Sequence, residues 1–171
     1  MDRLKLPSRQ SSITLQDITL DNWAAVTRLV VNQDQLGLAP SNLESLCEHQ
    51  FHIPQSIVRA ILADGTPIGY IRLQQEPKDQ GQDQSVGDSN HSMFLLLSFM
   101  IAKSCQGLGF GTKAILLLQQ EMRDRKGFKG IRVLTKPFAT VHPEDSPEHF
   151  FSGLGFEASE DPGKQELIWI P

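Results

Sequence analysis

The residues whose types and spacing most clearly suggest chemistry are the glycines of the run QGLGFG, Gln106–Gly111. An apolar run, Met93–Ile101, precedes them, and apolar residues at helical spacing follow from Phe110 onward. The glycines therefore mark a predicted turn from a strand into a helix. A helix N-terminus has unpaired amide groups and partial positive charge, and glycine has no Cβ, so a diphosphate can approach such a turn closely. The spacing alone also fits an ordinary glycine-rich turn.

Two familiar phosphate-binding loops fit this run poorly. The nucleotide-triphosphate loop ends in Gly-Lys-[Ser/Thr], whereas Gly111–Lys113 reads Gly-Thr-Lys. The dinucleotide fingerprint Gly-x-Gly-x-x-Ala matches from Gly109 to Ala114, but it calls for an acidic residue at the end of the next strand. The next predicted strand, Gly130–Lys136, ends in threonine and lysine. Neither loop accounts for the run.

A third pattern fits better. The spacing Gln106-x-x-Gly109-x-Gly111 after an apolar strand resembles the Gln/Arg-x-x-Gly-x-Gly/Ala signature of the GCN5-related N-acetyltransferase (GNAT) superfamily. Downstream, Phe150–Phe156 resembles the Leu/Phe-Tyr-x-x-Leu-Gly-Phe segment of that superfamily, in the expected order. The resemblance implies an α/β GNAT fold over residues 1–171. Such a fold has a mixed, mostly antiparallel sheet of six to seven strands, splayed between strands 4 and 5 and flanked by about four helices.

Further residues narrow the resemblance. Asn22-Trp23, Asp64–Tyr70, Phe99–Ile101 and Glu144–Pro147 look like the bacterial spermidine/diamine acetyltransferase branch. That branch transfers an acetyl group from acetyl-CoA to a primary amine, so the resemblance implies acetyl-CoA as co-substrate, a small amine such as a polyamine as acceptor, and no metal.

The resemblance also implies which residues bind acetyl-CoA. Backbone groups of Phe99, Met100 and Ile101 would pair with the pantetheine arm, and one N–H there, that of Met100, would stabilise the oxyanion. The amine attacks directly, so no protein nucleophile is needed. Main-chain N–H groups of the glycine loop would hold the pyrophosphate; the loop comprises Gln106, Gly107, Leu108, Gly109, Phe110, Gly111 and Thr112.

The chain departs from the family at the general acid. The family tyrosine that protonates the departing thiolate would fall at position 151, where this chain has Phe151. The only tyrosine, Tyr70, lies in a different predicted strand. Water, Ser146 or His149 are the alternatives, and a CoA thiol can also leave as the thiolate.

A second departure concerns the acceptor amine. The polyamine branch often has charged residues on its fourth strand, where this chain has Leu97 and Ser98. A cationic amine needs carboxylates nearby, and Glu44, Glu48 and Asp34 are the candidates. For each of them a solvated acidic surface is the alternative.

Composition sets the remaining bounds. A chain of 171 residues suits one domain, and a net charge of −4 with a pI near 5.7 gives no basic footprint for nucleic acid. No apolar run has the length of a membrane span, and the N-terminus does not resemble a secretory signal. Two cysteines, Cys47 and Cys105, form neither a disulfide framework nor a metal motif. We expect a cytoplasmic protein, and homodimers are common for the implied fold.

The periodicity predicts most of the secondary structure. We expect a loose lead-in at 1–11, a flexible loop at 76–92 that could serve as a lid, and a tight hairpin turn at Asp64–Thr66. The first helix should bury Trp23, Val26, Leu29 and Val30. The predicted strands are 13–16, 57–63, 67–74, 93–101, 130–134, one after 156, and 166–170, and the predicted helices are 22–31, 43–51, 110–126 and 147–154.

Three functional interpretations follow. The first is an N-acetyltransferase for a small amine such as a polyamine. The second is an acetyltransferase for another amine, such as an aminoglycoside, an amino acid or a peptide N-terminus. The third is a CoA-binding sensor or interaction module with little catalysis, which Phe151 favours.

Overall fold

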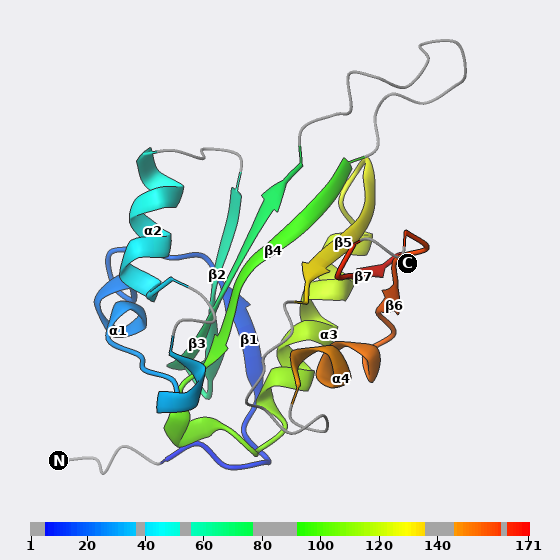
Figure 1. Ribbon diagram of the computed structural model, residues 1–171. Helices are drawn as coiled ribbons and strands as arrows, with labels where there is room; N and C mark the ends of the chain where they lie inside the picture. The colour runs from blue at the N-terminus through cyan, green and yellow to red at the C-terminus, as the bar shows by residue number, and fades with distance from the viewer. Residues whose placement is uncertain (1–5, 37–39, 52–55, 77–91, 136–145, 162–163) are drawn as a thin grey trace, which may run out of the picture.

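A single seven-stranded sheet forms the centre of the molecule (Figure 1). The computed structural model describes residues 6–36, 40–51, 56–76, 92–135, 146–161 and 164–171. The predicted loop at 76–92, except for its two end residues, and Glu144-Asp145 of the branch resemblance lie outside them.

The strand order in the sheet is β1-β2-β3-β4-β5-β7-β6, and every pair is antiparallel except β4-β5. The strands are β1 (Ile13–Gln16), β2 (Ser56–Ala63), β3 (Thr66–Gln75), β4 (Ser92–Ile101), β5 (Phe128–Leu134), β6 (Glu157–Ala158) and β7 (Glu166–Trp169).

Helices cover both faces of this sheet. On one face lie α1 (Trp23–Thr27) and α2 (Asn42–Phe51), and on the other lie α3 (Phe110–Arg123) and α4 (Pro147–Ser152) (Figure 1). The two faces bury separate apolar clusters. The smaller cluster includes Val26 and Tyr70, and the larger one includes Phe110 and Phe151. The two 3-10 turns η1 (Gln33–Gln35) and η2 (Lys103–Cys105) lie in the described connections.

Several predicted elements are confirmed, and the residues that predicted them have the expected geometry or burial. In the β2–β3 hairpin, Asp64 and Gly65 have φ values of 47° and 80°, which is the left-handed geometry that an Asp-Gly turn favours. The central helix α3 buries a stripe of residues at helical spacing: Phe110, Ala114, Ile115, Leu118, Gln119 and Met122.

The first helix was predicted too long. It ends at Thr27 instead of continuing to position 31: the amide of Leu29 donates to the carbonyl of Val26 (3.2 Å), three residues back, and the carbonyl of Val30 accepts from the amide of Lys103 (2.9 Å). Of the four predicted inner residues only Val26 is fully buried; Trp23 is 46% and Val30 is 54% exposed. The ends of α3 and α4 are also earlier than predicted, at Arg123 and Ser152.

Two searches of the described residues gave negative results. No helix among them is both long enough and apolar enough to span a bilayer. No group of three or more His, Cys, Asp or Glu side chains among them could bind a metal ion.

Candidate active site

The parallel strands β4 and β5 separate along their length. They pair only between Ser92–Leu95 and Phe128–Arg132, and beyond this point β4 pairs with β3 alone among the described strands, through Leu96 and Ser98–Ile101. From Ile131 onward β5 pairs with β7 on its other side. Because the two strands run in the same direction, the gap opens toward their C-terminal ends, as Figure 1 shows. Within the described residues this leaves the backbone edge of β4 without a strand partner, which is the splay that the family resemblance implied.

A β-bulge in β4 decides which side chains face which helices. The β3–β4 register shifts between Arg72 and Leu73, so Leu97 has no cross-strand partner. Beyond this bulge, Ser98 faces α2, where its Oγ lies 3.3 Å from the Oγ of Ser45. Phe99 faces α4. Bulges are frequent beside active sites because they redirect side chains in this way.

The loop after β4 has the geometry of a phosphate-binding corner. Gly107 and Gly109 have φ values of 73° and 79°, a conformation that residues with a Cβ rarely adopt. Across the described residues, no acceptor is bonded to the backbone N–H groups of Gln106–Thr112. These amides lie at the N-terminus of α3, where the helix dipole favours an anion. The loop therefore has the geometry of an anion-binding site.

The side chain of Gln106 fixes this loop to the rest of the fold. Its Nε2 donates to the carbonyl of Ile101 (2.9 Å) and to Oε1 of Gln35 (2.7 Å). Its Oε1 accepts from Nδ2 of Asn32 (2.7 Å). The amide side chain is thus fully engaged inside the protein, and only the backbone of Gln106 remains available to a phosphate.

Two cations, the exposed Arg9 and the partly buried Lys113, flank the loop. Nη2 of Arg9 donates to the carbonyl of Gly107 (3.4 Å), and Nζ of Lys113 donates to the carbonyl of Arg9 (2.8 Å). The N-terminal lead-in is therefore docked against the loop at Arg9. Both side chains add positive charge beside the unpaired amides.

Phe151 lies in a buried aromatic cluster against β4. It is 5% exposed, and its ring centroid is 6.1 Å from that of Phe99 and 5.0 Å from that of Phe150. The two side chains predicted as alternative acids lie at the start of α4. Ser146 is the N-cap of α4, accepting from the amide of His149 (3.1 Å), and His149 is exposed.

The single tyrosine lies on the opposite face of the sheet from Phe151. Tyr70 belongs to the smaller apolar cluster and is fully buried, and burial raises the pKa of its hydroxyl. It therefore does not replace the missing family tyrosine near α4.

The three predicted acceptor carboxylates have different surroundings. Glu44 closes a capping box: its Oε2 accepts from the amide (2.9 Å) and hydroxyl (2.7 Å) of Ser41, and these bonds lower its pKa. Glu48 accepts from Nη1 of Arg72 (2.7 Å). Asp34 is exposed in η1.

A buried polar group on the α2 face was not predicted from sequence. We call Ser45, Glu48, Tyr70, Arg72 and Ser98 the Arg72 cluster. Arg72 is 1% exposed, and its Nη1 donates to the carbonyl of Ser45 (2.9 Å) as well as to Glu48. The Ser45 hydroxyl lies 3.3 Å from both the Tyr70 and Ser98 hydroxyls. The sequence feature that could have indicated this cluster is Arg72 itself, a charged residue between the apolar Ile71 and Leu73 of a predicted strand.

Comparison with known families identifies this arrangement. The model of the acetyltransferase (GNAT) family matches residues 20–156. The chain belongs to the GNAT family. It is thus an acetyl-CoA-dependent acetyltransferase by family, and the predicted superfamily, fold and co-substrate are confirmed. No curated protein sequence matches the chain, and the spermidine/diamine branch stays a prediction.

Solved structures similar to this GNAT chain share its fold at low identity. Arabidopsis thaliana NAA60 with a bisubstrate analogue has a TM-score of 0.64 at 9% identity, over 93% of this chain and 98% of that one. The KacTA–DNA complex gives 0.63 at 19%, over 93% of both chains. A Tyr-to-Phe mutant of the toxin AtaT, bound to the C-terminus of the antitoxin AtaR and to acetyl-CoA, gives 0.59 at 17%, over 92% of both chains.

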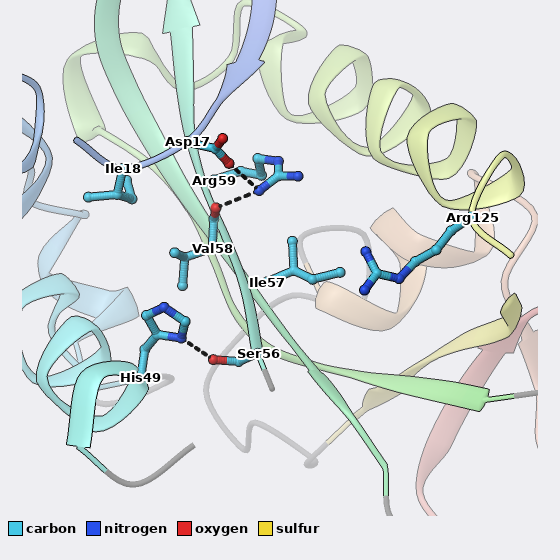
Figure 2. Close-up of a pocket in the computed structure, with 8 residues that line it drawn as sticks. All are labelled: Asp17, Ile18, His49, Ser56, Ile57, Val58, Arg59 and Arg125. Carbon is cyan, nitrogen blue, oxygen red and sulfur yellow. Dashed lines mark hydrogen bonds and ion pairs between the residues drawn. The ribbon is translucent and has the colours of Figure 1, made fainter. Parts of the chain in front are cut away.

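One surface hollow of the GNAT chain lies away from the splay. It has a volume of about 350 Å³ and lies where β1 ends and leaves Ser56–Arg59 of β2 uncovered (Figure 2). Arg59 bonds Asp17 (2.6 Å) and Glu121 there, and His49 bonds Ser56. Because these groups are paired with each other and lie far along the sheet from the glycine loop, we do not assign the hollow to acetyl transfer.

Proposed function

We propose that this GNAT chain acetylates the primary amine of a small molecule by direct attack on acetyl-CoA. The observation that carries the proposal is the edge of β4 at Leu96–Ile101, which leads into the glycine loop. Among the described residues, no strand pairs with this edge and no acceptor bonds the amides from Gln106 to Thr112. A backbone edge binds an amide-containing arm as a further strand would, and the loop binds an anion.

In the proposed mechanism the chain acts by binding and orientation. Acetyl-CoA supplies an activated acetyl thioester. The N–H of Met100 on the β4 edge donates to the thioester carbonyl oxygen as it becomes negative, a contact worth about 3–4 kcal/mol. The Met100 side chain is held by Asn42, whose Nδ2 lies 3.6 Å from the sulfur. The β4 edge and the loop hold the donor within about 3–3.5 Å of the amine, which lowers the entropic part of the barrier.

The proposed release of the thiol proceeds without a protein acid at position 151. Phe151 supplies a ring and no proton, so the CoA sulfur departs as the thiolate, and the amine proton passes to solvent. A positioned acid contributes about 10²–10⁴-fold, so we expect a slow enzyme. Among the solved neighbours, the AtaT structure is of a tyrosine-to-phenylalanine mutant with acetyl-CoA.

The proposed acceptor is a small primary amine. A polyamine or diamine follows from the branch resemblance, with Glu44, Glu48 and Asp34 as its contacts. Of these, Glu44 and Glu48 already bond groups of the protein. We place the reaction in the cytoplasm, with no nucleic acid and no membrane as partners and with a homodimer as the expected assembly.

A second candidate is a CoA-binding sensor or interaction module, and Phe151 favours it because it removes the family acid. Both candidates bind acetyl-CoA at the same proposed site, but only the enzyme transfers its acetyl group to an amine at a measurable rate. Among the neighbours, AtaT is bound to an antitoxin segment and KacTA to DNA, so protein and nucleic-acid ligands belong in the test of this candidate.

The test measures free-thiol release from acetyl-CoA with a panel of spermidine, spermine, diamines, amino acids and aminoglycosides, while calorimetry measures acetyl-CoA binding. Turnover with any amine supports the proposed enzyme. Tight binding without turnover, unrelieved by Phe151→Tyr, selects the binding module. If acetyl-CoA does not bind, the assignment of the glycine loop is wrong.

A further inference from the structure

The backbone of the glycine loop has few contacts that could fix its shape. Gly107 and Gly109 have left-handed φ values, and glycine has more backbone freedom to lose than any other residue. Among the described residues, a single hydrogen bond joins another segment to the backbone of Gln106–Thr112, from Nη2 of Arg9 to the carbonyl of Gly107 (3.4 Å). The shape of the loop therefore depends on how its side chains are anchored.

The side chain of Gln106 is the polar anchor at the start of the loop. Its Nε2 donates to the carbonyl of Ile101 (2.9 Å), and because a carbonyl can only accept, this bond fixes the orientation of the Gln106 amide. The second partner of Nε2 must then be an acceptor, and the partner of Oε1 must be a donor. The structure provides both, in Oε1 of Gln35 and Nδ2 of Asn32, each at 2.7 Å.

These two partners belong to one short turn that is itself tied down. The backbone amide of Asn32 donates to Oε1 of Gln35 (3.3 Å), and the amide of Gln35 donates back to the carbonyl of Asn32 (3.0 Å). Just before the turn, the carbonyl of Val30 accepts from the amide of Lys103 (2.9 Å). The chain around η1 is thus bonded internally, to the segment after β4, and to Gln106.

From these contacts we propose that Asn32 and Gln35 are positioning residues for the acetyl donor, which hold the glycine loop in its anion-binding shape through the side chain of Gln106. This inference rests on the proposed binding of acetyl-CoA by the loop and adds the connection between α1 and α2 to that site. A loop already held in its binding shape loses less conformational freedom when the ligand binds, so the affinity is higher. Asn32 and Gln35 need no contact with the diphosphate themselves.

The test makes the same chemical change at both positions, an amide to a carboxylate, and measures the Kd for acetyl-CoA by calorimetry. Asn32→Asp replaces a donor by an oxygen that faces Oε1 of Gln106, and binding should be about tenfold weaker. Gln35→Glu keeps an acceptor for Nε2 of Gln106, and the affinity should stay within about twofold of the native value. Because both variants add one negative charge to the same turn, charge alone predicts equal effects.

Three controls separate positioning from charge and from folding. Gln33→Glu adds the same charge at an exposed residue of η1 and should leave the Kd unchanged at high ionic strength. Gln106→Ala should itself weaken binding by about tenfold, and adding Asn32→Asp to it should cost nothing more, because the two residues act through one contact. Thermal unfolding checks that each variant is folded, and Asn32→Ala, which removes the donor without adding a charge, replaces Asn32→Asp if it is not.

Steady-state kinetics give a second readout that a purely structural role would not produce. Asn32→Asp should raise the KM for acetyl-CoA and leave both kcat and the KM for the amine unchanged. Equal Kd values for Asn32→Asp and Gln35→Glu, additive effects of Asn32→Asp and Gln106→Ala, or a lower melting temperature with a native Kd would each overturn this inference and leave the proposed function in place. If the native chain does not bind acetyl-CoA, the proposed function fails, and this inference fails with it.

Discussion

The two faces of β4 are built from opposite chemistry. Toward α4 the strand presents Phe99, whose ring is stacked on Phe150 at 5.7 Å between centroids. Toward α2 it presents Ser98, which contacts Ser45 within the Arg72 cluster. The apolar face continues into the aromatic cluster of α4, whereas the polar face is held by side-chain hydrogen bonds to α2. The two faces of β4 are thus chemically distinct, and each can be altered without the other.

The largest expected effect comes from restoring a hydroxyl to the aromatic face. Phe151→Tyr should raise kcat for amine acetylation by about 10²-fold, because it places a proton donor where the family has one. The same change buries a hydroxyl and should lower the free energy of unfolding by about 1–3 kcal/mol. Steady-state thiol release and thermal unfolding measure the two effects.

Phe156→Tyr is the matched control for this substitution. Phe156 is 3% exposed and its ring packs on Phe151 at 5.2 Å, so the variant also adds a hydroxyl to the cluster. We expect a stability loss without a gain in kcat. Equal rates in both variants would show that position 151 does not contact the leaving group.

The next largest effect is expected on acetyl-CoA binding by the glycine loop. Gly109→Ala forces a left-handed φ of 79° on a residue with a Cβ, at a strain of about 1–3 kcal/mol. If the loop relaxes to escape the strain, its amides move, and acetyl-CoA should bind roughly 5- to 100-fold more weakly. Gly65→Ala is the control, since Gly65 has a φ of 80° and equally open surroundings in the β2–β3 hairpin. It should lose stability but keep the acetyl-CoA affinity measured by calorimetry.

The polar face is tested by two glutamates one turn apart on α2. Glu48→Ala leaves Arg72 without its counter-charge and should lower the free energy of unfolding by about 2 kcal/mol, less than for a fully buried pair because Glu48 is 48% exposed. Urea unfolding at neutral pH measures this. A double variant, Arg72→Met with Glu48→Leu, should recover most of the loss, and a failure to recover would mean that Glu48 stabilises α2 by another route.

Glu44→Ala should destabilise less than Glu48→Ala, because it removes an exposed capping box. The sign of its pH dependence follows from the lowered pKa of Glu44. A carboxyl whose pKa is lower when folded stabilises fully above its unfolded pKa and loses that contribution as the pH falls through the folded pKa. The difference between native chain and variant should therefore disappear in acid, and a difference that persists there would contradict the cap assignment.

The smallest expected effect concerns the cations beside the loop. Arg9→Ala should weaken acetyl-CoA binding by a few-fold, and the difference should shrink with added salt, because exposed charges are screened. Arg28→Ala removes an exposed arginine at the end of α1 and should change nothing. Equal effects of the two variants would mean that only net charge matters, and that the docking of Arg9 against Gly107 plays no part.

The sequence predicted the parts of this molecule that depend on local chemistry. Gly107 and Gly109 are needed where they stand because of their own φ values, and Asp64-Gly65 turns for the same reason, so short patterns predicted both. The end of α1 was missed because the apolar spacing continues to Val30 although the chain leaves the helix after Thr27, and there the carbonyl of Val30 bonds Lys103, far along the chain. The Arg72 cluster was missed likewise, since it joins residues of α2, β3 and β4 through side-chain contacts, and Glu48 could not be recognised as the partner of Arg72 before the fold was known.

The most direct test of the account is residue-resolved amide hydrogen exchange with and without acetyl-CoA. The account predicts new protection at the gap-facing amides of Leu97–Ile101 and at Gln106–Thr112, with Ser92–Leu95, already paired with β5, unchanged. Protection confined to another surface, such as the uncovered edge of β2 at Ser56–Arg59, would contradict the claim that the splayed edge of β4 binds the acetyl donor.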